Sequence, residues 1–246
     1  MTNYPHLSNA PIAEAILDIR VDAGTGDSLA AVQVFAEAVR ADFPEQKPVQ
    51  VIDGFFEMAP DRPAKAQSKA TTLGQICWNS AKTRAVQARI DGFTINHVRH
   101  YGSWVELRDC ARKMWPRYVE IVKPKGVIRI ALRYINKLEF PPGDDLSNHL
   151  QTKLLLAQSL PQHIGESFIR VDLHFESERR AFITEATQPA TPEQARPKLL
   201  LDIDAYVSRP MAASDPKIWE ELEALHDIKN RCFFESLRPE TWRAYQ

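Results

Sequence analysis

Stretches in which apolar and polar residues alternate recur along the whole sequence, and they constrain the fold more than any other feature. Successive side chains of a β-strand point to opposite faces of a sheet, so this alternation predicts strands with one buried and one exposed face. Such strands are typical of an antiparallel sheet that is covered on one side. The strands expected from this pattern and from local composition cover residues 12–21, 127–140, 168–177, 181–187 and 198–207.

Further strands are expected in the first half of the chain. Residues 49–58 and 73–80 have strand composition, and the polar residues 59–72 between them, rich in Pro, Lys and Ala, are typical of an exposed hairpin loop. Residues 84–98 are expected to form one more strand, in which Asp91-Gly92 marks a bulge or bend.

Apolar residues at spacings of three and four predict helices between these strands. The expected helices cover residues 28–43, 103–123, 145–156 and 215–236. Ser103 and Glu106 have the spacing of a capping box, which predicts the start of the second helix. Pro116 is expected to kink or interrupt that helix.

The expected elements follow the same order twice, because residues 1–124 and 125–246 each read as strand, helix, three strands and helix. A shift of 115 residues places Trp104-Val105-Glu106-Leu107 on Trp219-Glu220-Glu221-Leu222. The pattern suggests an internal duplication, and chance similarity between two amphipathic helices is the alternative. Both interpretations predict an α+β protein with a large, twisted, mostly antiparallel sheet and helices on one face, in one continuous fold.

The charge balance argues against a protein that binds nucleic acid with its whole surface. Lys and Arg number 31 against 32 Asp and Glu, which gives a formal net charge of −1, so binding to a polyanion would need a local basic patch. The sequence shows no signal peptide and no apolar run long enough to cross a bilayer. We therefore expect a soluble protein that is not attached to a membrane.

The cysteines indicate a reducing compartment. Cys77, Cys110 and Cys232 are widely separated and form no CxxC pair, which argues against a disulfide framework and a structural zinc site. The motifs GxGxxG, GxxxxGK[ST], HExxH and GxSxG are also absent from the sequence. These observations predict a cytoplasmic protein without a metal or an organic cofactor.

Two acidic and two basic residues stand out on expected strands. Asp202 and Asp204 share one strand face, and so do Arg129 and Arg133 on another strand. Ion pairing between the two rows is the first interpretation. The alternatives are a metal site at the aspartates and a pocket in which the arginines bind a carboxylate or phosphate.

The last expected helix carries a second candidate cluster. His226, Lys229 and Asn230 lie at one edge of the helix, beside an apolar stripe that includes Leu222 and Leu225. These residues could line a binding site, or they could make structural hydrogen bonds at the edge of the helix.

Several sequence blocks together resemble an uncharacterised, sporadically distributed prokaryotic family of about this length. The blocks are Asn9-Ala10-Pro11-Ile12-Ala13-Glu14-Ala15, Asp91-Gly92-Phe93, Leu132-Arg133-Tyr134-Ile135-Asn136, Leu201-Asp202-Ile203-Asp204, and Lys229-Asn230 with Phe233-Phe234-Glu235-Ser236. The resemblance implies a free-standing bacterial protein encoded by a mobile or accessory gene. It adds Asn136 to the candidate binding residues and implies no reaction, cofactor or catalytic residue.

Three classes of function remain open from the sequence. The first is a non-enzymatic binding or assembly protein of an accessory, defence-related bacterial system, acting on a protein partner or as a homo-oligomer. The second is a sensor or enzyme for a small anion, with a cleft lined by Arg129, Arg133, Asp202, Asp204, His226 and Lys229. The third is a nucleic-acid-binding regulator. The absence of catalytic motifs favours the first class.

Overall fold

The fold is known from a computed structural model of the chain. It describes residues 4–23, 28–59, 62–99, 101–142, 144–162, 164, 166–188 and 196–246. For residues 28, 53–59 and 62–67 it describes the backbone alone.

A single sheet of nine strands contains strands from both halves of the chain. Its order is β2-β3-β4-β5-β1-β6-β9-β8-β7, and every neighbouring pair is antiparallel. The expected α+β class with a large antiparallel sheet is therefore confirmed. The strands are β1 (Ile12–Asp22), β2 (Glu45–Ala59), β3 (Arg62–Trp78), β4 (Arg84–Arg89), β5 (Gly92–Val98), β6 (Gly126–Glu139), β7 (Ser167–His174), β8 (Arg179–Gln188) and β9 (Lys198–Val207).

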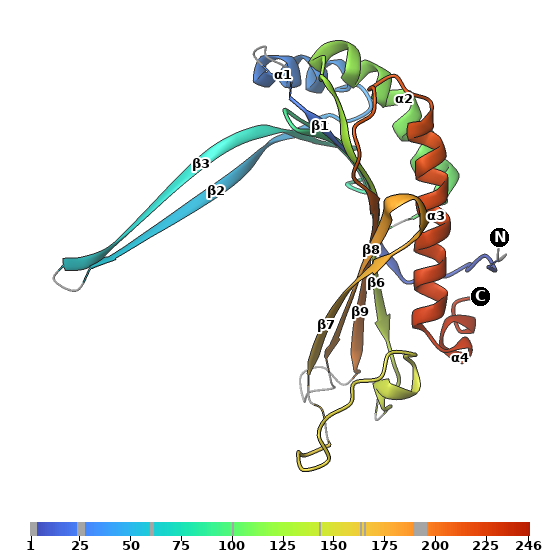
Figure 1. The fold of residues 1–246 in the computed structure, drawn as a ribbon. Coiled ribbons are helices and arrows are strands. Elements are labelled where there is room, and N and C mark those ends of the chain that lie inside the picture. Colours follow the sequence, from blue (N-terminus) through green and yellow to red (C-terminus); the bar gives the residue numbers. More distant parts are fainter. Residues whose placement is uncertain are drawn as a thin grey trace.

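The helices pack on one face of this sheet (Figure 1). They are α1 (Ser28–Ala38), α2 (Trp104–Val122), α3 (Lys217–Ser236) and the short α4 (Pro239–Arg243). Ser103 caps α2 by accepting a hydrogen bond from the backbone N–H of Glu106 at 3.2 Å, as the capping pattern predicts. Pro116 does not interrupt α2, which continues to Val122.

The hydrophobic core lies between the helices and the covered face of the sheet. Alternate residues of β1, including Leu17 and Ile19, are fully buried there. Phe93 of β5 contacts Phe35 of α1 and Tyr118 of α2, with ring centroids 6.2 and 5.5 Å apart. The inward-facing apolar residues of the strands thus pack against the apolar stripes of the helices in one buried layer.

A long hairpin is the largest departure from the expected fold. β2 and β3 pair from Glu45↔Trp78 to Ala59↔Arg62, whereas β3 pairs with β4 only from Gly74 to Trp78. Residues 50–59 and 62–73, here called the arm, therefore project beyond the sheet as two strands (Figure 1). The loop expected at residues 59–72 is wrong, because Ala59 ends β2 and the residues from Arg62 onward belong to β3; residues 60 and 61 lie outside the described residues.

The arm escapes sequence analysis for a physical reason. Residues 50–52 and 68–71 are all exposed, because neither face of the arm is covered by another layer. The alternation that indicates a half-buried strand is absent from such a ribbon. Gly74 lies where the arm leaves the sheet, and a Cβ atom there would stand 2.1 Å from the backbone oxygen of Ala88. Close approach between β3 and β4 thus requires glycine at this position.

Two further expectations are wrong. Residues 84–98 form two strands, β4 and β5, because Ile90 and Asp91 form a tight two-residue turn between Arg89 and Gly92, which pair with each other. Residues 145–156 do not form a helix. Only Leu146–Asn148 is helical there, as a single 3₁₀ turn capped by Asp145, and residues 151–155 are exposed and belong to no helix or strand.

The two halves are arranged around the centre of the sheet in a similar way. Outward from β1 the strands are β5, β4, β3 and β2, and outward from β6 they are β9, β8 and β7, so the first half has one more strand at its edge. At the centre Leu17 pairs with Leu132, its counterpart under the shift of 115 residues. A two-fold axis between antiparallel strands pairs equivalent residues in this way, so the register supports the duplication hypothesis.

Equivalent ion pairs also join strand and helix in each half. Arg84 at the start of β4 pairs with Glu106 of α2 at 3.1 Å. Arg179 at the start of β8 pairs with Glu221 of α3 at 2.8 Å. Glu221 follows Glu106 by 115 residues, whereas Arg179 follows Arg84 by 95, so the two arginines correspond by the place of their strands in the sheet and not by the shift of 115 residues.

Candidate functional site

The acidic and basic rows of β6 and β9 form ion pairs on the open face of the sheet. Arg129 Nη2 donates to both carboxylate oxygens of Asp204, at 3.0 and 2.8 Å. Arg133 donates to Asp202 through Nε at 2.9 Å and through Nη2 at 2.6 Å. The first interpretation of these four residues, cross-strand ion pairing, is confirmed.

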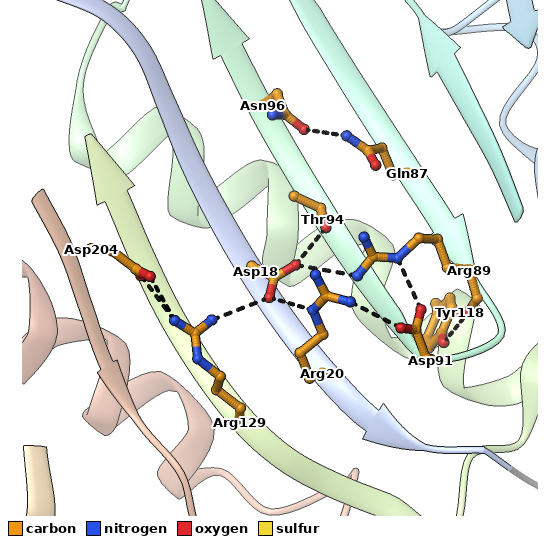
Figure 2. Close-up of polar contacts among 10 residues, drawn as sticks. All are labelled: Asp18, Arg20, Gln87, Arg89, Asp91, Thr94, Asn96, Tyr118, Arg129 and Asp204. Carbon is orange, nitrogen blue, oxygen red and sulfur yellow. Dashed lines mark hydrogen bonds and ion pairs between the residues drawn. The ribbon is translucent and has the colours of Figure 1, made fainter. Parts of the chain in front are cut away.

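The ion pairs continue into a network across the centre of the sheet, which Figure 2 shows. Asp18 accepts a hydrogen bond from Thr94 Oγ1 at 2.8 Å and one from Arg20 Nε at 3.0 Å. Arg129 Nη1 lies 3.5 Å from the same carboxylate, and Arg89 pairs with Asp91 at 3.0 Å. Charges on this face are thus matched by partners within the sheet, which favours a structural role over an anion pocket.

The other four candidate residues lie on the opposite, helix-covered side. Asn136 of β6 and His226, Lys229 and Asn230 of α3 line one cavity of about 540 Å³. None of the four arginines and aspartates of the open face lines this cavity in the described part of the chain. The single cleft that combines both sets is therefore wrong, because alternate residues of β6 point to opposite faces.

Four segments enclose this cavity, here called the lysine cavity. They are β6, α3, the N-terminal segment 4–12, and residues 99 and 101–104 before and at the start of α2. The described residues that line it are Tyr4, Pro5, His6, Leu7, Ser8, Asn9, Ala10, Ile12, Arg99, Tyr101, Gly102, Ser103, Trp104, Tyr134, Asn136, His226, Lys229, Asn230, Phe233 and Phe234.

Lys229 is the central side chain of the lysine cavity. It is 7% exposed, and its Nζ donates a hydrogen bond to Asn230 Oδ1 at 2.6 Å and lies 4.0 Å from the centre of the Tyr134 ring. Within the described chain, no carboxylate lies at ion-pairing distance from this ammonium group. Burial lowers the pKa of Lys229 to about 7, because the charged form loses its hydration without gaining a counter-ion.

Aromatic residues surround the lysine. The hydroxyl groups of Tyr101 and Tyr134 lie 2.9 Å apart, and burial raises the pKa of Tyr101 to about 12. Trp104 stacks on the imidazole of His226 with centroids 4.8 Å apart. Burial lowers the pKa of His226 to about 3, so this imidazole is neutral at physiological pH. The walls thus offer flat apolar surfaces and neutral hydrogen-bonding groups.

The N-terminal segment is fixed in place as one wall of the cavity. The Tyr4 ring stacks on Phe234 of α3 with centroids 4.6 Å apart, and its hydroxyl donates to Glu235 at 3.2 Å. The backbone N–H of Asn9 donates to the carbonyl oxygen of Tyr245 at 3.0 Å. The N-terminal segment is therefore held against α3 and the C-terminal residues, and Figure 1 shows this segment beside α3.

The charge of the lining favours a negatively charged ligand. Arg99 is a cation and Lys229 is one when protonated, whereas no Asp or Glu is among the described lining residues. Arg99 is exposed and forms no ion pair in the part of the chain that the structure describes. An anion at this position would offset the cost of burying the Lys229 ammonium.

In the first half of the chain, the residues that the shift of 115 places on this cavity are apolar. Under the shift of 115 residues, Tyr134, Asn136, His226 and Lys229 correspond to Ile19, Val21, Ala111 and Met114. All four counterparts are buried hydrophobic residues of the core. The fold is thus stable with apolar residues here, which favours a functional reason for the buried lysine and asparagine in the second half.

Sequence analysis found the residues of the helix and missed most of the cavity. His226, Lys229 and Asn230 share one edge of α3, a relation that helical spacing gives directly. Tyr101, Trp104 and the N-terminal wall come from distant segments, and no local pattern indicates that they meet. The blocks around Ala10 and Tyr134 were the only available signal, because both belong to the set that carries the family resemblance.

The described residues contain neither a candidate metal site nor a helix that could span a membrane. No group of three or more His, Cys, Asp or Glu side chains is placed to hold a metal ion among them. Within the same ranges, none of the helices combines the length and the apolar character that crossing a lipid bilayer requires.

Comparison with known proteins adds no family assignment. No protein-family model matches the chain, and no curated protein matches it.

Proposed function

We propose that this protein is a binding protein for a small organic anion, which it holds in the lysine cavity. The observation that carries the proposal is Lys229, a buried amine without a carboxylate partner in the described chain, at the wall of a cavity of about 540 Å³; a bound anion would favour its protonated form. A cavity of this volume is large enough for a metabolite-sized molecule. A carboxylate or phosphate would supply the missing counter-charge.

The aromatic walls narrow the ligand class to anions with a flat, apolar part. Tyr101, Tyr134 and Phe233 line the space next to Lys229. Aromatic rings favour stacked or edge-on contacts with another ring. Asn136, Asn230 and the neutral His226 can hydrogen-bond to polar substituents and so select among aromatic acids.

Matched probes of similar size test this proposal. Phenyl phosphate and benzoate should raise the melting temperature by several degrees at saturating concentration, because ligands that bind only the folded state stabilise it. Benzyl alcohol and benzylamine should have no comparable effect, since they lack the negative charge. Isothermal titration calorimetry then gives the affinity of each probe.

Two variants localise the binding to the cavity. Lys229→Met should reduce the affinity for the anionic probes at least tenfold, whereas Lys113→Met, which removes an exposed lysine of α2, should leave it unchanged. Equal binding of all four probes, or unchanged anion affinity in Lys229→Met, would contradict the proposal.

The arm supports assembly as a second function. Two-stranded ribbons without a covered face are only marginally stable alone in water, and β2 is an edge strand whose outer hydrogen-bonding groups face no other strand of the described sheet. We propose that the arm pairs with another copy of the chain. Replacing residues 50–73 by a short turn should then convert an oligomer into a monomer in light scattering, and an unchanged mass would contradict this role.

We place this binding protein in the cytoplasm of a bacterium. All three cysteines are free thiols, and Cys77 and Cys232 are buried, which suits a reducing compartment. The resemblance to a sporadically distributed prokaryotic family supports a role in an accessory, defence-related system.

A further inference from the structure

A second cavity lies at the other end of the covered face, beneath β7 and β8. It has a volume of about 780 Å³ and shares no lining residue with the lysine cavity. Its walls are the inner faces of β7 and β8 and the irregular segment that replaces the expected helix at residues 145–156. The functional role proposed for the lysine cavity does not involve this space.

A buried carboxyl group is the polar feature of this second cavity. Glu185 of β8 is 3% exposed, and its Oε1 accepts a hydrogen bond from Thr152 Oγ1 at 2.8 Å. Its Oε2 is buried and has no hydrogen-bond partner within the described residues. No lysine or arginine in the same ranges lies at ion-pairing distance from it. Burial therefore raises the pKa of Glu185.

The unpaired oxygen of Glu185 calls for a ligand that donates hydrogen bonds. A buried acceptor without a partner costs about 1 to 3 kcal/mol, and more when it is charged. An ammonium group offers three donors and a positive charge, so it would both pair with the oxygen and favour the ionised carboxylate. An anionic ligand would be repelled by the same group.

The other charged groups of the cavity leave the position beside Glu185 open. Asp144 lies 3.2 Å from His149, and Asp145 caps the 3₁₀ turn by accepting the N–H of Ser147. Arg238 donates through Nε to the carbonyl oxygen of Leu150. Lys153 is exposed, so it can stay in solvent when a cation occupies the interior.

The remaining walls suit an aliphatic chain. Leu146, Leu150, Leu154, Leu155, Ile164 and Ile169 line the cavity. Of these, Leu155 is 88% exposed and Leu154 47% exposed, which is unusual for large apolar residues in such a group. An aliphatic ligand would cover part of this surface and gain roughly 25 cal/mol for each Å² buried.

We propose that this second cavity binds an aliphatic primary amine, with the ammonium group on Glu185 and the hydrocarbon chain along the leucine-rich wall. The proposal is independent of the lysine cavity and of the anion that we place there. The amine proposed for the second cavity is positively charged and the ligand proposed for the lysine cavity is negatively charged, so different probes test the two sites.

Three six-carbon probes test the charge preference in the unmodified protein. Hexylamine should bind at least tenfold more tightly than hexanol by calorimetry at pH 7.5, and hexanoate should not bind detectably. Equal affinity for hexylamine and hexanol, or tighter binding of hexanoate, would overturn the proposal. This comparison needs no variant and stands even where a substitution unfolds the chain.

Variants then identify the carboxyl group. Glu185→Gln, which keeps the shape and removes the charge, should reduce the hexylamine affinity to that of hexanol. Glu139→Gln, at an exposed glutamate of β6, is the matched control and should bind hexylamine normally. Lys229→Met should also keep hexylamine binding, which separates this site from the lysine cavity. Normal hexylamine binding by a folded Glu185→Gln variant would overturn the assignment.

Discussion

Lys229 and His97 are side chains whose burial lowers the stability of the folded protein. Lys229 lies among aromatic rings without a counter-ion in the described chain, and His97 of β5 is 1% exposed with neither ring nitrogen hydrogen-bonded there. Burial shifts the titration of both groups, in each case against the charged form. The pH dependence of unfolding therefore reports directly on both residues.

Lys229→Met should stabilise the protein, and more so at pH 6 than at pH 9. The lysine pKa falls from 10.5 to about 7 on folding, so the unfolded chain binds the extra proton between these values. The penalty is complete below pH 7 and disappears above pH 10.5. Since each tenfold displacement of a protonation equilibrium corresponds to about 1.4 kcal/mol, and the penalty grows over the two pH units from 9 to 7, the gain should be roughly 3 kcal/mol larger at pH 6.

Urea unfolding of wild type and variant at both pH values measures this difference. Methionine is the suitable replacement because Met114 occupies the corresponding position of the first half. A gain in unfolding free energy that is the same at pH 6 and pH 9 would show that Lys229 is not buried as described.

His97→Leu should make the protein less sensitive to acid. Burial, assisted by the charge of Arg84, lowers the pKa of His97 from 6.5 to about 4. As the pH falls from 6.5 to 4, His97 is protonated in the unfolded chain but not in the folded state. Protonation therefore favours unfolding, and the protein loses stability over this pH range. Between pH 7.5 and 4.5, wild type should lose about 2 to 3 kcal/mol more than the variant in urea unfolding.

The comparison between wild type and His97→Leu also controls for His226, the other buried histidine of this account. His226 has a pKa lowered to about 3 by burial and destabilises both proteins alike in acid. Equal acid losses in the wild type and in His97→Leu would rule out the buried, neutral state of His97.

At the level of elements, equivalent ion pairs in the two halves have different environments. The Glu106 carboxylate of α2 is 49% exposed, and the Glu221 carboxylate of α3 is 7% exposed and contacts both Arg179 and Arg209. Exposed pairs contribute at most about 1 kcal/mol, whereas breaking a buried pair leaves uncompensated charge. The ion pair of Glu221 should therefore contribute more to the free energy of unfolding than the ion pair of Glu106.

Glu221→Gln and Glu106→Gln form a matched pair that tests this difference. We expect Glu221→Gln to reduce the unfolding free energy by about 3 kcal/mol and Glu106→Gln by less than about 1 kcal/mol, measured by urea unfolding at pH 7. Equal losses in the two variants would mean that burial does not distinguish the two halves.

Sequence patterns predicted the strands and helices that have one buried and one exposed face. They did not predict the segments that lack a buried face. β1, β6 and β9 alternate clearly, and α2 and α3 carry apolar stripes, so their positions were predicted closely. The arm has two exposed faces and therefore resembles a loop. The segment after Asp145 has apolar residues at helical spacing, yet its residues 152–155 are exposed and line the cavity of Glu185 without forming a helix.

At the scale of the whole molecule, the site depends on an asymmetry between similar halves. The central pair Leu17 and Leu132 and the ion pairs of Arg84 and Arg179 correspond in the two halves, but the lysine cavity has polar residues in only one of them. Sequence analysis could identify the helix edge that carries Lys229. It could not predict that β6, the N-terminal segment and the start of α2 close around it, since those contacts exist only in the tertiary structure.

Equilibrium dialysis against a mixture of cellular metabolites, with mass spectrometry of the retained molecules, tests the central claim most directly. Wild type, Lys229→Met and Lys113→Met are compared at the same concentration and pH. The account predicts that aromatic carboxylates or phosphates are enriched by wild type and by Lys113→Met, and are lost from Lys229→Met. Retention of the same molecules by all three proteins, or of uncharged and cationic molecules alone, would contradict it.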